Sequence, residues 1–154
     1  MSNVVIVSGY FNPLHEGHVE YFKLAKEYAG ENGKLIAIVN SDYQSILKKK
    51  YSFVPERDRM AVISALKYVD KAVLSIDRDR SVCETIRKLI DDKDFGPITH
   101  FANGGDVTEN SKCPEEIVCN QHNVKLVYGL GDKIQSSSWI LESSVREYCK
   151  YHTI

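Results

Sequence analysis

Apolar runs alternate with helical patterns along the whole chain. Five runs rich in β-branched residues are continuous rather than alternating, as expected for strands that are buried on both faces of a sheet. These runs are residues 4–7, 35–39, 72–76, 98–102 and 124–128. The order predicts a single-domain, Rossmann-like α/β fold over residues 1–154, with a five-stranded parallel sheet and helices on both faces.

Apolar residues recur every three to four positions between the runs, which predicts helices. The expected helices cover residues 19–29, 56–69, 82–90, 115–122 and 138–148. Ser81 stands where an N-cap of the third helix would lie, and Pro114 precedes the fourth. Residues 41–55 are expected to form the one long polar loop.

Composition and charge exclude several classes of protein. With 20 basic and 21 acidic residues the net charge is −1, which gives no support to binding of nucleic acid or a membrane surface by bulk charge. No apolar run is long enough to span a bilayer, and no secretory signal is evident. The four cysteines show no zinc spacing. We therefore expect a cytoplasmic protein with reduced thiols that binds neither nucleic acid nor membrane.

Unusual polar clusters follow four of the predicted strands. They read GYFNPLHEGH (residues 9–18), NSDYQ (40–44), NGGD (103–106) and GLGDKIQSSS (129–138). In parallel α/β sheets ligands bind outside the carboxyl ends of the strands. The common position of these clusters therefore predicts a functional site at that edge of the sheet.

Two histidines stand at the junction between the first strand and the first helix. His15 and His18 have an i, i+3 spacing that places both near the first helical turn, where free N–H groups already favour an anion. The imidazoles would add donors and partial positive charge, and Gly17 allows a ligand to approach closely. Plain helix capping is one alternative. A zinc site is another, although H-E-x-H is one residue short of H-E-x-x-H.

A second anion site is predicted at the start of the last helix. Ser136, Ser137 and Ser138 supply three consecutive hydroxyls beside free backbone N–H groups, and Lys133 stands shortly before them. A polar N-cap alone would explain one of the three hydroxyls. The Walker and dinucleotide-binding glycine motifs are absent from the sequence.

Basic and acidic residues complete the predicted edge. Lys48, Lys50 and Arg59 lie in or just after the long loop, where they form either a phosphate clamp or a solvated surface. Asp106, after Gly105, has a carboxylate that can accept from a ribose, a base or metal-bound water. A simple turn is the alternative for the two glycines before it.

These motifs together resemble the HxGH nucleotidyltransferases, in their small cytidylyltransferase-like branch. That branch includes glycerol-3-phosphate cytidylyltransferase and the heptose-phosphate adenylyltransferase domain. The resemblance rests on G-Y-F-N-P-L-H-E-G-H, the Arg59-Met60 pair, N-G-G-D and Q-S-S-S-W-I, and it covers nearly the whole chain.

The resemblance implies that an acceptor phosphate attacks the α-phosphorus of a nucleoside triphosphate and that pyrophosphate leaves, with Mg²⁺ bound to the triphosphate. His15, His18 and Lys48 would be catalytic, with Lys48 between the acceptor and nucleotide phosphates. Lys50 would assist in binding phosphate, and Arg59 would bind a phosphate of the acceptor or of the triphosphate. The implied nucleotide-binding residues are Gly9, Tyr10, Phe11, Asn12, Gly105, Asp106, Lys133, Ser136, Ser137 and Ser138.

The donor and the acceptor stay open at this point. We expect transfer of CMP from CTP to a phosphorylated small molecule (a polyol, sugar or head-group phosphate), with an ATP-using adenylyltransferase for a sugar phosphate as the alternative. Gly131 stands where cytidylyltransferases of this type carry an arginine, and Asn12 replaces the family's usual Asp. A catalytically silent nucleotide sensor is the alternative of another class. The resemblance also implies a homodimer.

Overall fold

Five parallel strands form one sheet in the order β3-β2-β1-β4-β5 in the computed structural model, which describes residues 3–104, 113–131 and 135–152. The strands are β1 (Val4–Gly9), β2 (Lys34–Val39), β3 (Lys71–Leu74), β4 (His100–Gly104) and β5 (Lys125–Leu130). Every pairing between neighbours is parallel. The Rossmann-like fold class predicted from the sequence is confirmed, and all five apolar runs contribute a strand.

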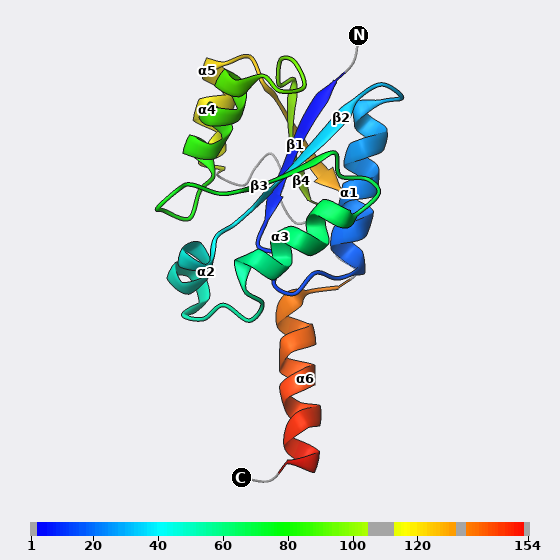
Figure 1. Cartoon of the computed structure of the whole chain (residues 1–154), viewed down its shortest axis with the longest axis vertical. Helices are drawn as coiled ribbons and strands as arrows, with labels where there is room; N and C mark the ends of the chain where they lie inside the picture. The colour runs from blue at the N-terminus through cyan, green and yellow to red at the C-terminus, as the bar shows by residue number, and fades with distance from the viewer. Residues whose placement is uncertain (1–2, 105–112, 132–134, 153–154) are drawn as a thin grey trace.

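Alternate residues of the central strand belong to two separate cores. Val5 and Val7 pack on the side of α1 (Glu16–Ala29) and α3 (Glu56–Ala65). Val4 and Ile6 pack on the opposite side, which is covered by α4 (Cys83–Asp92) and α5 (Glu115–Gln121) (Figure 1). Because β1 is buried on both faces, the continuous apolar run that predicted it has a direct structural cause.

The predicted loop over residues 41–55 is wrong, because it contains the helix α2 (Asp42–Lys49). The Ser41 hydroxyl accepts a hydrogen bond from the Gln44 backbone N–H (3.2 Å), and the Gln44 side chain accepts from the Ser41 N–H (3.0 Å). This reciprocal capping box fixes the first turn. The helix buries Gln44 and Ser45 and exposes Ile46, so it has no apolar stripe that hydrophobic periodicity could detect.

Several other helix boundaries differ from the prediction, and two of them have a direct structural reason. The helix predicted over 56–69 ends at Ala65, because Leu66 is already extended. The N-cap of α4 is Val82 rather than Ser81. The carboxylate of Asp77 instead accepts from the backbone N–H groups of Glu84 (2.8 Å) and Thr85 (3.0 Å), which satisfies the first turn of that helix from outside it.

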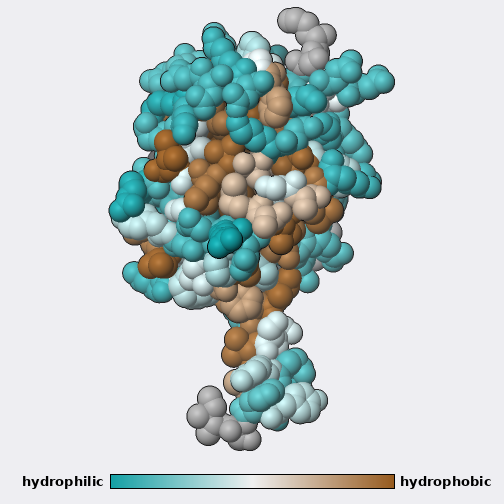
Figure 2. All heavy atoms as spheres, viewed as in Figure 1, coloured by the Kyte–Doolittle hydropathy of each residue, from teal (hydrophilic) through white to brown (hydrophobic). Residues whose placement is uncertain are grey.

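The last helix, α6 (Ser137–Tyr151), projects from the rest of the molecule (Figure 1). None of its residues is buried. In the same view, Figure 2 shows hydrophobic surface where α6 leaves the body and more hydrophilic surface toward its far end. Among the helices of the described residues, none is long and apolar enough to cross a membrane.

Candidate active site

A cavity of about 560 Å³ lies at the carboxyl ends of the strands, where the sequence clusters predicted a site. Its walls come from the β1–α1 junction, α2, the β3–α4 loop and the first residues of α5 and α6. The predicted site residues that line it are Gly9, Tyr10, Phe11, His15, His18, Lys48, Ser136, Ser137 and Ser138. The cavity also has lining residues outside the predicted set, among them Ser8, Asn40, Lys49, Arg80, Asn103, Glu115 and Gln135.

The two histidines are locked into the start of α1 by backbone hydrogen bonds. His15 is the N-cap, and its Nδ1 accepts from the Gly17 backbone N–H (3.1 Å). Nδ1 of His18 accepts from the His15 backbone N–H (3.2 Å), and the two rings stack with centroids 3.7 Å apart. A neutral imidazole that accepts at Nδ1 carries its proton on Nε2. Both rings are therefore fixed as Nε2–H donors at the cavity.

Burial keeps both rings uncharged. Desolvation lowers the pKa of His18 to about 3 and also lowers the pKa of His15 below its usual 6.5. This corrects the expectation that the pair adds positive charge, because at neutral pH the rings act as neutral hydrogen-bond donors. Within the described part of the chain, no group of three or more His, Cys, Asp or Glu side chains could hold a metal ion.

The aromatic ring of Phe11 packs under the junction that carries the two histidines. Phe11 is buried, and its ring packs edge-on against His18 (centroids 5.0 Å apart) and Phe22 (5.1 Å). A Cβ on Gly9 would lie only 2.7 Å from that ring, so this position has room only for glycine. The apolar contact of His18 with Phe11 is also part of the burial that lowers its pKa.

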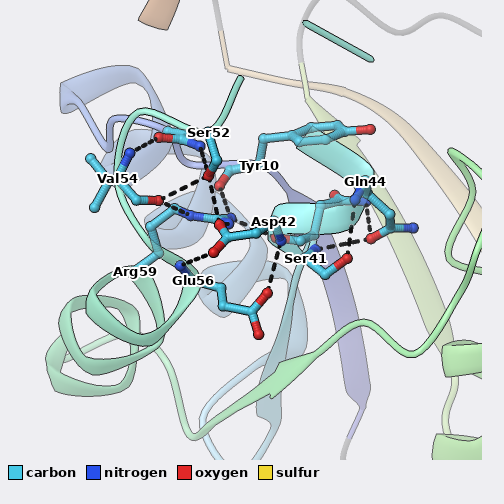
Figure 3. Close-up of polar contacts among 10 residues, drawn as sticks. Tyr10, Ser41, Asp42, Gln44, Ser52, Val54, Glu56 and Arg59 are labelled. Atoms are coloured by element: carbon cyan, nitrogen blue, oxygen red, sulfur yellow. Dashed lines mark hydrogen bonds and ion pairs between the residues drawn. The ribbon is translucent and has the colours of Figure 1, made fainter. Parts of the chain in front are cut away.

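Arg59 does not lie at the cavity. The residue is only 2% exposed, and its guanidinium donates to the carbonyls of Val54 (2.8 Å) and Tyr10 (2.8 Å) and to the Asp42 carboxylate (2.7 Å) (Figure 3). A fourth bond goes to the carbonyl of Asn40. With four of its five N–H groups bonded to internal acceptors, the arginine holds loops together, which corrects the expectation that it binds a phosphate.

Asn12 also braces a loop instead of lining the cavity. Its side-chain N–H₂ donates to the Ser52 hydroxyl (3.1 Å), and its carbonyl oxygen accepts from the Val54 N–H (2.6 Å). An aspartate could accept from Val54 but could not donate to Ser52 when ionised. The asparagine therefore fits a clamp between the β1–α1 junction and the segment after α2.

The three consecutive lysines have three different positions. Lys48 lines the cavity with its Nζ 4.4 Å from the centre of the Tyr10 ring. Lys49 lines it as well, and its Nζ lies 3.5 Å from the Ser138 hydroxyl at the start of α6. Lys50 is the exposed C-cap of α2 and is not a lining residue. The structure thus brings the first two of the run to the site.

Each of the three serines has its own partner. The Ser136 hydroxyl caps α6 by accepting from the Trp139 N–H (3.1 Å). Ser137 donates to the carbonyl of Pro13 (2.8 Å), which ties α6 to the histidine junction, and Ser138 lies beside Lys49. The capping alternative therefore accounts for Ser136 only.

Some predicted residues lie outside the described part of the chain, and some lining residues were missed. Gly105, Asp106 and Lys133 are the predicted residues outside it. Glu115 and Arg80 are lining residues that no sequence motif identified. The signal that could have found Arg80 was its place in the polar D-R-D-R segment directly after the third strand.

Comparison with known proteins connects this geometry to a family. Residues 6–145 match the model of the cytidylyltransferase-like family. A protein named FAD synthase from Korarchaeum cryptofilum is 31% identical over 153 residues, which cover 97% of this chain and 96% of the relative. Another FAD synthase, from Methanopyrus kandleri, is 40% identical over 82 residues, and the match spans only about half of its length (55%).

A solved structure has the same fold. It is a lipopolysaccharide core biosynthesis protein from Thermoplasma volcanium, with a TM-score of 0.64 and 26% sequence identity. The match covers 86% of this chain and 99% of that protein.

Proposed function

The chain belongs to the cytidylyltransferase-like family, and from this premise we propose that it is an adenylyltransferase that makes FAD. It would transfer AMP from ATP to the terminal phosphate of flavin mononucleotide (FMN). The family match confirms the resemblance to nucleotidyltransferases found in the sequence. The relatives named FAD synthase favour the ATP-using alternative over the CTP-using reaction expected there, and FMN replaces the sugar phosphate as the acceptor.

The observation that carries the proposal is the pair of neutral imidazoles with fixed Nε2–H donors. In nucleotidyl transfer, negative charge grows on the oxygens around the α-phosphorus. Donors that are already oriented toward this charge stabilise the transition state without reorganisation, and each is worth about 10²–10³ in rate. His15 and His18 supply two such donors at the N-terminus of α1, where the helix dipole also favours an anion.

The reaction needs no protein nucleophile or general base. An oxygen of the FMN phosphate forms a bond to the α-phosphorus of ATP, the bond from that phosphorus to the bridging oxygen breaks, and pyrophosphate leaves. A phosphate monoester has its second pKa at about 6, so the attacking oxygen is already ionised at neutral pH. The tasks left to the protein are positioning and charge compensation.

Other residues of the cavity fit these tasks. We propose that the first turn of α6, with Ser136 to Ser138, binds the β- and γ-phosphates and that Lys49 offsets their charge, while Lys48 lies between the nucleotide and acceptor phosphates. Mg²⁺ would enter with the triphosphate, held by phosphate oxygens and water as this small ion prefers, and it would neutralise part of the phosphate charge. Arg59 would act by holding the backbone of Tyr10 and Asn40. The homodimer stays a prediction.

The test is product formation with purified protein, Mg²⁺, FMN and either ATP or CTP. We expect one FAD and one pyrophosphate per turnover with ATP, and little product with CTP. Riboflavin, which lacks the phosphate, is the matched control and should give no product.

Other outcomes of this assay would contradict the proposal. Pyrophosphate release with CTP and a polyol or sugar phosphate, but not with ATP and FMN, would restore the cytidylyltransferase assignment. Tight nucleotide binding without pyrophosphate release for any acceptor tried would favour the sensor.

A further inference from the structure

A second hollow adjoins the active-site cavity. It has a volume of about 430 Å³, and its lining residues are Tyr10, Lys48, Asp79, Arg80, Ser81 and Pro114. Tyr10, Lys48 and Arg80 also line the first cavity, so these three residues form the boundary between the two spaces. A molecule bound in the second hollow would meet the nucleotide site at this boundary.

The loop that carries Arg80 is fixed by a buried glutamine. The side-chain N–H₂ of Gln44 donates to the carbonyls of Asp79 and Ser81 (both 2.8 Å), which are the two neighbours of Arg80. The Gln44 carbonyl oxygen in turn accepts from the Asn40 side chain and the Ser41 backbone, both 3.0 Å away. Figure 3 shows how Gln44 and Ser41 lie together. This fully bonded, inaccessible side chain places the backbone of Arg80 with little freedom.

Two cationic side chains meet at Tyr10. The ammonium of Lys48 lies 4.4 Å from the centre of the Tyr10 ring, and Arg80 lines both spaces together with Tyr10. Burial raises the pKa of the Tyr10 hydroxyl, and the positive charge of Arg80 opposes this shift. The nearest acid of the loop is Asp79, whose carboxylate accepts from the Ser81 backbone N–H (2.9 Å) and hydroxyl (2.7 Å). Asp79 is bonded to its own turn, and the other acid near Tyr10, Glu115, lines the first cavity and accepts from the Val82 backbone N–H (3.0 Å). Lys48 and Arg80 are the cationic side chains that line both spaces.

We propose that Lys48 and Arg80 bind the phosphate of the acceptor and that the second hollow holds the acceptor's body. This inference rests on the proposed function, in which two anionic phosphates must approach each other. Bringing them together requires cations between them, and a guanidinium can bind a phosphate through two parallel hydrogen bonds. Arg80 is thereby assigned as a residue that determines selectivity for a phosphorylated acceptor.

The test compares Arg80→Ala and Arg80→Lys with Arg78→Ala. Arg78 belongs to the same loop but lies 3.9 Å from the Tyr43 ring and lines neither space. With ATP and FMN, Arg80→Ala should raise KM for FMN about tenfold or more, since a bond to a charged group is lost, and should leave KM for ATP unchanged. Arg80→Lys should recover part of the loss. Equal KM values for FMN in Arg80→Ala and Arg78→Ala would overturn the inference.

A second measurement separates this inference from the proposed function. Inorganic phosphate is titrated by calorimetry in the presence of a non-hydrolysable ATP analogue, so neither turnover nor a flavin is needed. Arg80→Ala should weaken phosphate binding by about fivefold or more, and Arg78→Ala should not. If the wild type makes no FAD yet shows this difference, the proposed function fails and the phosphate site stands. If the wild type makes FAD and the difference is absent, the phosphate site fails alone.

Discussion

Two helix N-termini face the same cavity, but they are held in very different ways. The start of α1 is capped by His15, and behind it Tyr21, Phe22, Ala25 and Ala29 are buried in the core. The start of α6 is capped by Ser136, and no residue of that helix is buried. Two polar contacts tie its first turn to the body, from Ser137 to Pro13 and from Ser138 to Lys49.

The difference suggests a division of labour between the two ends. Both offer free N–H groups to an anion. Donors that stabilise a transition state must not move during the reaction, and the junction of β1 and α1 meets this requirement through its core packing. A helix with few buried contacts can move away from the body at a low cost in free energy. This suits the start of α6 if it must let a triphosphate enter the cavity and pyrophosphate leave it.

The start of α1, with His15 and His18, is the rigid end of this comparison, and the start of α6 is the weakly held end. The largest expected effect comes from removing one fixed hydrogen-bond donor at the rigid end. In His18→Asn the side-chain oxygen can still accept from the His15 N–H, but Nε2–H is lost. We expect kcat to fall by about 10²–10³, because one transition-state donor is missing. Melting temperature should stay close to that of the wild type, since the cap is kept. Steady-state kinetics and thermal denaturation measure both quantities.

His18→Gln serves as the control for this variant. Its longer side chain can carry an N–H donor nearer to the position of Nε2, so it should recover part of kcat. A His18→Asn enzyme within threefold of wild-type kcat would show that the imidazole is not a catalytic donor.

The rigid end could be predicted well from the sequence, because the residues that form it are close together along the chain. An apolar run, a glycine and two histidines within a few residues predicted the strand, the helix and the pair that faces the cavity. The charge state could not be predicted in the same way. It depends on the burial of His18 against Phe11, a buried residue whose position follows from the packed core.

The positions of two arginines could not be predicted from the residues next to them in the sequence. Arg59 follows a basic run, yet it lies among carbonyls from three segments that only the fold brings together. Arg80 stands in a polar D-R-D-R segment that marks only the edge of the sheet, and its place at the cavity depends on a buried glutamine that lies 35 residues before Asp79 in the sequence. Hydrogen bonds across such separations leave no periodic signal in a sequence.

The next largest effect concerns the stability of the rigid end at acid pH. The pKa of His18 is about 3 in the folded protein and ordinarily 6.5, so below pH 6.5 the unfolded state binds a proton that the folded state does not. Stability from this residue is present above pH 6.5 and falls as pH drops toward 3, by up to roughly 2 kcal/mol at about pH 5. Denaturant unfolding at several pH values measures the change.

The same asparagine variant tests the source of this pH dependence. His18→Asn should lose less stability than the wild type between pH 6.5 and 5, because it carries no group that titrates there. If the free energy of unfolding fell equally with decreasing pH in the two proteins, other groups would control the loss of stability in acid. The ring of His18 would then not be held neutral by the fold.

The smallest effect is expected at the weakly held end. Ser137→Ala removes the hydrogen bond to Pro13, which is worth about 1 kcal/mol. If α6 binds the triphosphate and this bond holds it in place, KM for ATP should rise about fivefold while kcat changes little. Melting temperature should hardly change, because the helix buries no side chain and contributes little to the core. Ser144→Ala, on the exposed surface of the same helix, is the matched control.

Ser137→Ala is measured by its melting temperature and by its KM for ATP, and each quantity tests a different part of the comparison between the two helix ends. A large fall in melting temperature would mean that α6 is part of the cooperative unit, and the two ends would then differ in sequence but not in stability. An unchanged KM for ATP, equal to that of Ser144→Ala, would mean that the triphosphate does not depend on this helix end. A raised KM for ATP with an unchanged melting temperature is the result expected for a loosely held binding element. Displacing such an element lowers the affinity of the protein for ATP but does not weaken the packing of the core.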